Sequence, residues 1–89
     1  MPRYLAELYL PMAGPGDLEK AAARACTAAE EMSRGGCTVR CLRSIFVPAD
    51  QTCLLLFDAG STTSVHRVTE RARLQVTRVV EAIEPASPR

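Results

Sequence analysis

Four side chains in predicted strands have the chemistry to bind or act on a small ligand: Glu7, Tyr9, Arg43 and Glu81. If the odd-numbered positions of every strand face one side of a sheet, these four share that side with Cys41 and Cys53. Two carboxylates and one arginine in a half-buried, aliphatic environment shift each other's pKa. The group can therefore hold a small ligand or a metal ion, or it can serve only as an ion-pair network that fixes the register of two subunits.

His66, the single histidine of the chain, is the metal-ligand candidate in a predicted helix. Glu70 follows one turn later, and a His-x3-Glu pair lies on one helix face, where both side chains can reach one ion. Such an ion needs at least two further ligands. A solvated histidine is the simpler interpretation, so the pair indicates a divalent-metal site only weakly.

The four cysteines, at positions 26, 37, 41 and 53, lack the closely spaced C-x2-C pairs of structural zinc and iron–sulfur sites. We expect reduced thiols. A hairpin that turns about Asp50 would place Cys53 opposite Val47 and Cys41 opposite Ala59. Those two thiols would then be too far apart to share an ion or a bond.

The elements that must position these residues begin with a strand over residues 4–10, in which Ala6 and Leu8 alternate with Glu7 and Tyr9. A helix follows, with Asp17 as its predicted N-cap and Gly35-Gly36 at its end. Its apolar stripe repeats at steps of three and four, at Leu18, Ala22, Ala25, Ala29 and Met32.

A hairpin occupies the middle of the chain: β-rich runs at 38–47 and 53–57 are joined through residues 48–52, which contain Pro48 and Asp50. Ser61 is the predicted cap of a second helix, whose apolar stripe is Val65, Val68 and Ala72. A last strand spans 76–83.

This order of elements predicts an α+β fold of the ferredoxin-like type, βαββαβ, with a four-stranded antiparallel sheet and two helices on one of its faces. We expect residues 1–84 to form a single domain and residues 85–89 to form a loosely ordered C-terminal tail. The strands are apolar on both sides, but two helices cover only one side. We therefore expect a homodimer in which two uncovered sheet faces pack together as a dimeric α+β barrel.

Composition argues against several classes of partner. The net charge is +1 and 24% of residues are charged, so the basic excess of a nucleic-acid binder is missing. The strand at 53–57 has Phe57 as its single aromatic residue, too few for base stacking. No run approaches the roughly 18 apolar residues of a membrane span, and the first residues lack the apolar region of a secretory signal. We expect a soluble cytoplasmic protein with neither a nucleic acid nor a membrane as partner.

Several short motifs carry a resemblance to a known family: Pro2-Arg3-Tyr4-Leu5 with Glu7, Arg43-Ser44 followed by Phe46 and Val47, the run 53–59, and Arg78-Val79-Val80-Glu81. Over roughly residues 2–84, a length typical of one small domain, the chain resembles a family of small bacterial proteins of uncharacterised function, one of which is described as nickel-binding. The resemblance implies a ferredoxin-like subunit in a dimeric α+β barrel, with nickel as a candidate ligand.

The chain departs from this family at two positions that concern nickel. Nickel-binding relatives have a histidine before the serine of the second strand, whereas this chain has Arg43, a protonated guanidinium that does not ligate metals. Relatives also have a histidine late in the second helix, whereas His66 lies earlier.

The leading functional hypothesis is a small homodimeric binding protein that holds a small ligand, or a divalent metal such as nickel, at the open sheet face. Glu7, Tyr9, Arg43 and Glu81 are the ligand-binding candidates, and His66 and Glu70 are the metal candidates. The alternative is an isomerase- or cyclase-like enzyme, with Glu7 or Glu81 as general base and Arg43 steadying a developing oxyanion. The resemblance in barrel shape to muconolactone isomerases is one of fold alone.

Overall fold

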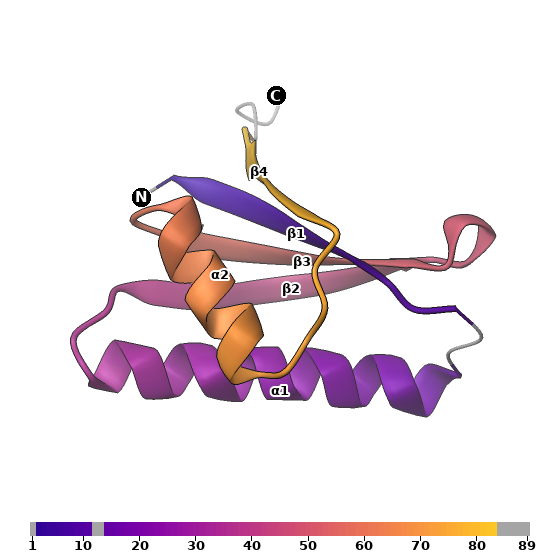
Figure 1. Ribbon diagram of the computed structural model, residues 1–89, viewed down its shortest axis with the longest axis horizontal. Helices are drawn as coiled ribbons and strands as arrows, with labels where there is room; N and C mark the ends of the chain where they lie inside the picture. Colours follow the sequence, from indigo (N-terminus) through magenta and orange to yellow (C-terminus); the bar gives the residue numbers. More distant parts are fainter. Residues whose placement is uncertain (1, 12–13, 84–89) are drawn as a thin grey trace, which may run out of the picture.

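The computed structural model describes residues 2–11 and 14–83. Its elements in chain order are β1 (Arg3–Tyr9), α1 (Pro15–Arg34), β2 (Val39–Val47), the 3-10 turn η1 (Pro48–Asp50), β3 (Thr52–Ala59), α2 (Thr62–Arg71) and β4 (Arg78–Ala82). The strands form one antiparallel sheet in the order β2-β3-β1-β4. α1 runs beside β2, and α2 crosses the strands (Figure 1). This arrangement confirms the predicted ferredoxin-like α+β fold.

The helix ends follow local capping rules. α1 begins three residues earlier than predicted, since its N-cap is Gly14 and Asp17 occupies the third helical position. The Asp17 carboxylate still helps the helix start, because its Oδ2 accepts a hydrogen bond of 3.0 Å from the Gly14 N–H. At the other end Gly35 is the C-cap, and Gly36 follows with φ of 99°, a left-handed conformation that favours glycine.

α2 begins as predicted. The Ser61 hydroxyl accepts a hydrogen bond of 3.3 Å from the Ser64 N–H, which satisfies one of the free donors in the first turn. Val65 and Val68 are buried on its inner face, and Ala72, at its C-cap, is buried as well. Because this helix is only 10 residues long, its stability depends on that packing rather than on its own hydrogen bonds.

The hairpin has a shorter turn than the sequence indicates. Val47 pairs with Thr52 and Phe46 with Cys53, so the predicted pairing of Cys53 with Val47 is wrong by one residue. Pro48 begins the 3-10 turn, and Gln51 ends it with a left-handed φ of 52°. A second irregularity, a bulge between Cys41 and Arg43, shifts the remaining pairs again.

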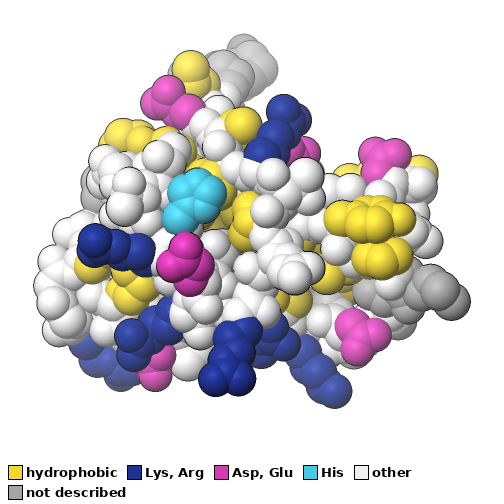
Figure 2. All heavy atoms as spheres, viewed as in Figure 1, with side chains coloured by type: hydrophobic (Ala, Val, Ile, Leu, Met, Phe, Trp, Pro, Cys, Tyr) yellow, Lys and Arg dark blue, Asp and Glu magenta, His cyan; other side chains and the backbone are white. Residues whose placement is uncertain are grey.

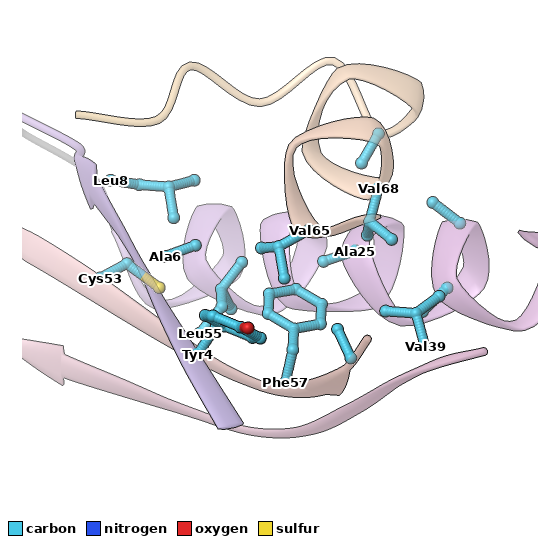
Figure 3. Packing of buried hydrophobic residues seen from close by; sticks show 14 residues of the cluster. Tyr4, Ala6, Leu8, Ala25, Val39, Cys53, Leu55, Phe57, Val65 and Val68 are labelled. Atoms are coloured by element: carbon cyan, nitrogen blue, oxygen red, sulfur yellow. The ribbon is translucent and has the colours of Figure 1, made fainter. Parts of the chain in front are cut away.

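A continuous core lies between the sheet and the two helices. The strands contribute Tyr4, Ala6, Leu8, Leu55 and Phe57, and the helices contribute small residues such as Ala25, Ala28 and Ala29 together with the two valines of α2. Figure 3 shows the strand side chains Tyr4, Ala6, Leu8, Leu55 and Phe57 on the side of the sheet that the helices cover. Alanines on α1 let the helix backbone lie close to the sheet, so that Phe57, fully buried, fills the space between the helices.

The last strand is shorter than predicted. β4 covers five residues, from Arg78 to Ala82, instead of the predicted 76–83. The predicted tail at 85–89 lies outside the described residues. Within the described ranges, neither helix combines the length and the apolar character needed to cross a membrane.

Candidate functional site

The sheet face that points away from the helices, here called the open face, is the candidate site. Cross-strand pairing assigns residues to it, because directly opposed residues share a face. Leu5 of β1 lies between Leu56 of β3 and Val80 of β4. One step along, Glu7 lies between Leu54 and Arg78. The open face therefore alternates rows of apolar side chains with rows that contain charges.

An apolar strip crosses the middle of this face. It consists of five residues from four strands: Leu5, Ile45, Leu54, Leu56 and Val80. Neighbours shield its centre, where Leu56 retains 8% exposure, whereas Ile45 on the outer strand β2 is 50% exposed. The exposed Ile45 and the half-buried Leu5, Leu54 and Val80 leave aliphatic surface on this face, which is typical of surfaces that meet another surface.

Two cross-strand ion pairs flank the strip. Arg78 Nε donates a hydrogen bond to Glu7 Oε2, which ties β4 to β1. Arg3 Nε lies 3.1 Å from Asp58 Oδ1 and ties β1 to β3. Both pairs keep appreciable contact with solvent, so each adds little to the stability of an isolated subunit. Their main structural effect is to neutralise charge on an otherwise apolar face.

Tyr9 and Arg43 lie at the margins of the open face. The Tyr9 hydroxyl is 3.3 Å from Gln51 Oε1, and the residue as a whole is 58% exposed. Arg43 pairs with Leu56 on the outer strand β2 and is exposed. Within the described part of the chain no ion pair engages Arg43, so its guanidinium is available to an incoming anion.

The structure brings Glu7, Tyr9 and Arg43 to one face, as expected, but it separates them from Glu81. Glu81 pairs with Tyr4, whose side chain points under the helices, so Glu81 lies on the opposite side of the outer strand β4 and is exposed there. The prediction that Glu81 shares the open face is wrong, because odd residues of β1 pair with even residues of β4. Arg78 takes the place that Glu81 was expected to hold.

The predicted positions of the two strand cysteines, on the same face as Glu7, are wrong for the same reason. Cys53 and Cys41 lie on the helix-covered face, since Cys53 pairs with Leu8 and Cys41 with Phe57, both of which are core residues. β3 is out of phase with β1, so its even residues are the ones on the open face. β2 changes phase at its bulge, and for that reason Arg43 reaches the open face while Cys41 does not.

The metal candidates lie elsewhere, on α2. His66 and Glu70 are both exposed one turn apart, and Figure 2 shows the imidazole at the molecular surface. Among the described residues no three side chains of the histidine, cysteine, aspartate and glutamate types come together around a point that could hold an ion.

Sequence reasoning missed the role of Arg78 as the partner of Glu7. The sequence singles out Arg78 only within the run Arg78-Val79-Val80-Glu81, and nothing in that run indicates a contact with Glu7. The contact depends on the register between β1 and β4. These two strands are about 70 residues apart in sequence and pair only in the folded sheet.

Comparisons with known proteins place the fold but not a function. No protein-family model matches the chain, and no curated protein matches it. The structure is similar to a crystal structure of SCO4226 from Streptomyces coelicolor A3(2), with a TM-score of 0.79, over 94% of this chain and 99% of that one. The two sequences are 19% identical, a level at which the similarity shows the fold alone.

Proposed function

We propose that this protein is a homodimeric binding protein in which two open faces meet and enclose a chamber for a small organic ligand. The observation that carries the proposal is the apolar strip, because its aliphatic side chains lie on a sheet face that neither helix covers. A second copy of the chain would remove that surface from water. Such burial contributes about 25 cal/mol for each Å² of apolar area.

The charges of the open face suit a two-fold partner. A two-fold axis brings the same patch of both subunits together, so the patch must complement itself. This face carries both signs, with the Glu7 and Asp58 carboxylates beside arginines on the same sheet. Because these carboxylates are already paired, bringing two copies together does not bury an unpaired carboxylate from either pair.

The ligand we propose is a small, partly apolar carboxylate. The exposed Arg43 guanidinium can bind a carboxylate through two parallel hydrogen bonds, and the leucines of the strip offer apolar contacts to the rest of the molecule. Tyr9 adds a hydroxyl at the margin of the same face.

The pairing of Glu7 supports binding rather than acid–base catalysis. A general base needs a carboxylate that is free to take a proton, whereas Glu7 is held by Arg78. Glu81, the other candidate base, lies on the opposite side of the sheet from Arg43. The isomerase- or cyclase-like alternative therefore needs Arg78 to release Glu7 before that carboxylate can act as a base.

Oligomeric state tests the interface. We expect native mass spectrometry and light scattering to show a dimer for the unaltered protein and a monomer for Ile45→Lys, which puts a charge into the apolar strip. Thr63→Lys, on the exposed surface of α2, is the matched control and should remain a dimer. A monomeric unaltered protein, or a dimeric Ile45→Lys variant, would contradict the proposed interface.

Ligand binding is tested with benzoate as the probe and benzyl alcohol as its uncharged counterpart. Benzoate should shift the NMR signal of the Arg43 side chain, benzyl alcohol should not, and Arg43→Gln should abolish binding while leaving the dimer intact. Arg78→Gln, which removes another arginine from the same face, is the control and should still bind benzoate. Equal binding of benzoate to the unaltered protein and to Arg43→Gln would show that Arg43 is not the anion site.

Nickel binding at His66 and Glu70 stays a prediction that the same native mass spectra can test. Untagged protein, purified without a metal-affinity resin, is measured before and after addition of nickel. Uptake of a defined number of ions that His66→Ala abolishes would support the prediction. A spectrum unchanged by nickel would exclude it.

A further inference from the structure

Two cysteines from different elements, α1 and β2, lie next to each other on the helix-covered side of the sheet. Cys26 lies in the middle of α1, one residue after the buried Ala25, and Cys41 lies on the helix-facing side of β2 where its bulge begins. Their Sγ atoms are 2.6 Å apart, and all four cysteines of the chain are free thiols. The pair thus links the long helix to the outermost strand of the sheet.

Both cysteine residues are partly exposed to solvent. They line a cleft of about 570 Å³ between α1 and β2, and both residues are only partly buried. The polar walls of the cleft are formed by Glu30, Ser33, Arg34 and Arg40. The two guanidinium groups of Arg34 and Arg40 give the cleft positive charge that attracts anionic reagents.

We propose that Cys26 and Cys41 form a redox-active dithiol that a small, carboxylate-bearing disulfide of the glutathione class oxidises to an intramolecular disulfide. The site is separate from the open face, since Cys41 lies on the opposite side of the sheet from Arg43. The contact between the sulfurs supplies the geometry for the bond, and the arginines of the cleft complement the carboxylates of the reagent.

The reaction is two successive thiol–disulfide exchanges. The Cys26 thiol loses its proton, and its sulfur attacks the small disulfide; a Cys26–glutathione bond forms as the glutathione S–S bond breaks, releasing one glutathione thiolate. The Cys41 sulfur then loses its proton and attacks the Cys26 sulfur, releasing the second glutathione thiolate. The two protons end on the two glutathione thiols, so the protein dithiol is oxidised by two electrons and the reagent is reduced by two.

The order of attack follows from the surroundings of the two sulfurs. Burial, together with the neighbouring Cys26 sulfur, raises the pKa of Cys41 to about 12, which keeps Cys41 protonated near neutral pH. A protonated thiol is a poor nucleophile, so Cys26 makes the first attack and Cys41 resolves the mixed disulfide.

The remaining cysteines provide internal controls. Cys37 is half-buried, with its Sγ 3.7 Å from the Ser64 hydroxyl, and Cys53 is buried in the core at 2% exposure. Neither is in hydrogen-bond contact with another thiol in the described part of the chain. A reaction confined to Cys26 and Cys41 would therefore reflect their shared cleft rather than general exposure.

The test is a titration of the fully reduced protein with buffers of oxidised and reduced glutathione, followed by maleimide labelling and peptide mass mapping. We expect two thiols to become unreactive together, a disulfide between the peptides that contain Cys26 and Cys41, and full reversal by dithiothreitol. Cys37→Ser should behave like the unaltered protein. Cys41→Ser should stop at a glutathione adduct on Cys26, and Cys26→Ser should form neither adduct nor disulfide at the same poise.

Circular dichroism separates loss of folding from loss of the site, because each variant must keep the spectrum of the unaltered protein. The melting temperature of the unaltered protein gives a second test. Oxidation should raise the melting temperature by about 10 °C, since a bond between Cys26 and Cys41 constrains the unfolded chain. A glutathione adduct spread over several cysteines, or a disulfide that joins two chains, would overturn the proposal.

Discussion

The two faces of the sheet are built from the same strands yet differ in what covers them. On the helix-covered face Ala6, Leu8 and Phe57 have no exposed surface, whereas on the open face Ile45 and Tyr9 are 50% and 58% exposed. Both faces are rich in aliphatic residues, but among the described residues only the open face carries cross-strand ion pairs. A solvent-facing side of an antiparallel sheet is normally polar, and the proposed dimer would account for the aliphatic residues on this one.

The largest expected effect separates a core residue from an open-face residue on the same strand. Phe57→Ala should lower the free energy of unfolding by about 3–5 kcal/mol, because it leaves a cavity between the helices. Leu54→Ala, on the open face of β3, should cost less, and its cost should depend on protein concentration if the face is a dimer interface. Urea unfolding followed by circular dichroism at two protein concentrations measures both; equal, concentration-independent losses would remove the distinction between the faces.

A smaller loss of stability is expected from a change at the N-cap of α2, one of the two helices that cover the sheet. Ser61→Ala removes the oxygen that accepts the Ser64 N–H at the start of α2, at a cost of about 1 kcal/mol. The control is Thr63→Ala, an exposed position in the first turn of the same helix. Thermal unfolding of the two variants should differ, and hydrogen exchange in α2 should speed up only in Ser61→Ala. Matching melting temperatures would show that packing alone determines the position of α2.

The ion pair on the open face should contribute less still to one subunit. A double-mutant cycle with Glu7→Gln and Arg78→Gln should give a coupling of about 0.2–1 kcal/mol in the monomer, since the Arg78 side chain is 64% exposed. The Ile45→Lys variant, which we expect to be monomeric, supplies the background for this measurement. A coupling that is larger in the dimer than in the monomer would show that association removes the pair from water, and an equal coupling would place the pair outside the interface.

The last prediction concerns stability at alkaline pH and involves no change at neutral pH. Burial raises the pKa of the Cys41 thiol from 9.0 to about 12 and also raises the pKa of Cys53, so the folded protein holds these protons longer than the unfolded chain does. The stability they contribute is complete below pH 9.0 and falls as the pH rises toward the folded-state values. Unfolding of the reduced protein should therefore become easier above about pH 9, and less so for Cys41→Ala, with Cys37→Ala as the control. A flat profile for the unaltered protein would contradict the raised pKa values.

Much of the architecture was predictable because it depends on local chemistry. The alternation of Ala6 and Leu8 with Glu7 indicated a two-faced first strand, and Ser61 marked the start of α2. Asp17 was misassigned as the N-cap, since its carboxylate acts from the third position and Gly14 occupies the cap. The two possible caps, Gly14 and Asp17, place the start of the helix three residues apart, and the sequence alone does not decide between them.

The candidate site was predictable only in part. Glu7, Tyr9 and Arg43 do share a face, but Arg43 does so because of the bulge after Cys41, which no residue in the sequence announced. Glu81 was placed on that face by assuming one parity for all strands. A shift of one residue in register moves every side chain of a strand to the other side of the sheet.

By itself, then, the sequence determined the order of strands and helices, the helix stripes and the excess of apolar residues over what two helices can cover, because these depend on residue type and period. The tertiary structure decided which side of the sheet each strand residue faces, through the four-residue turn after Val47 and the bulge before Arg43. It also decided the two pairings that matter most, Glu7 with Arg78 and Cys26 with Cys41. Both join elements that meet only when the whole sheet and its helix are assembled, so no local pattern could have predicted them.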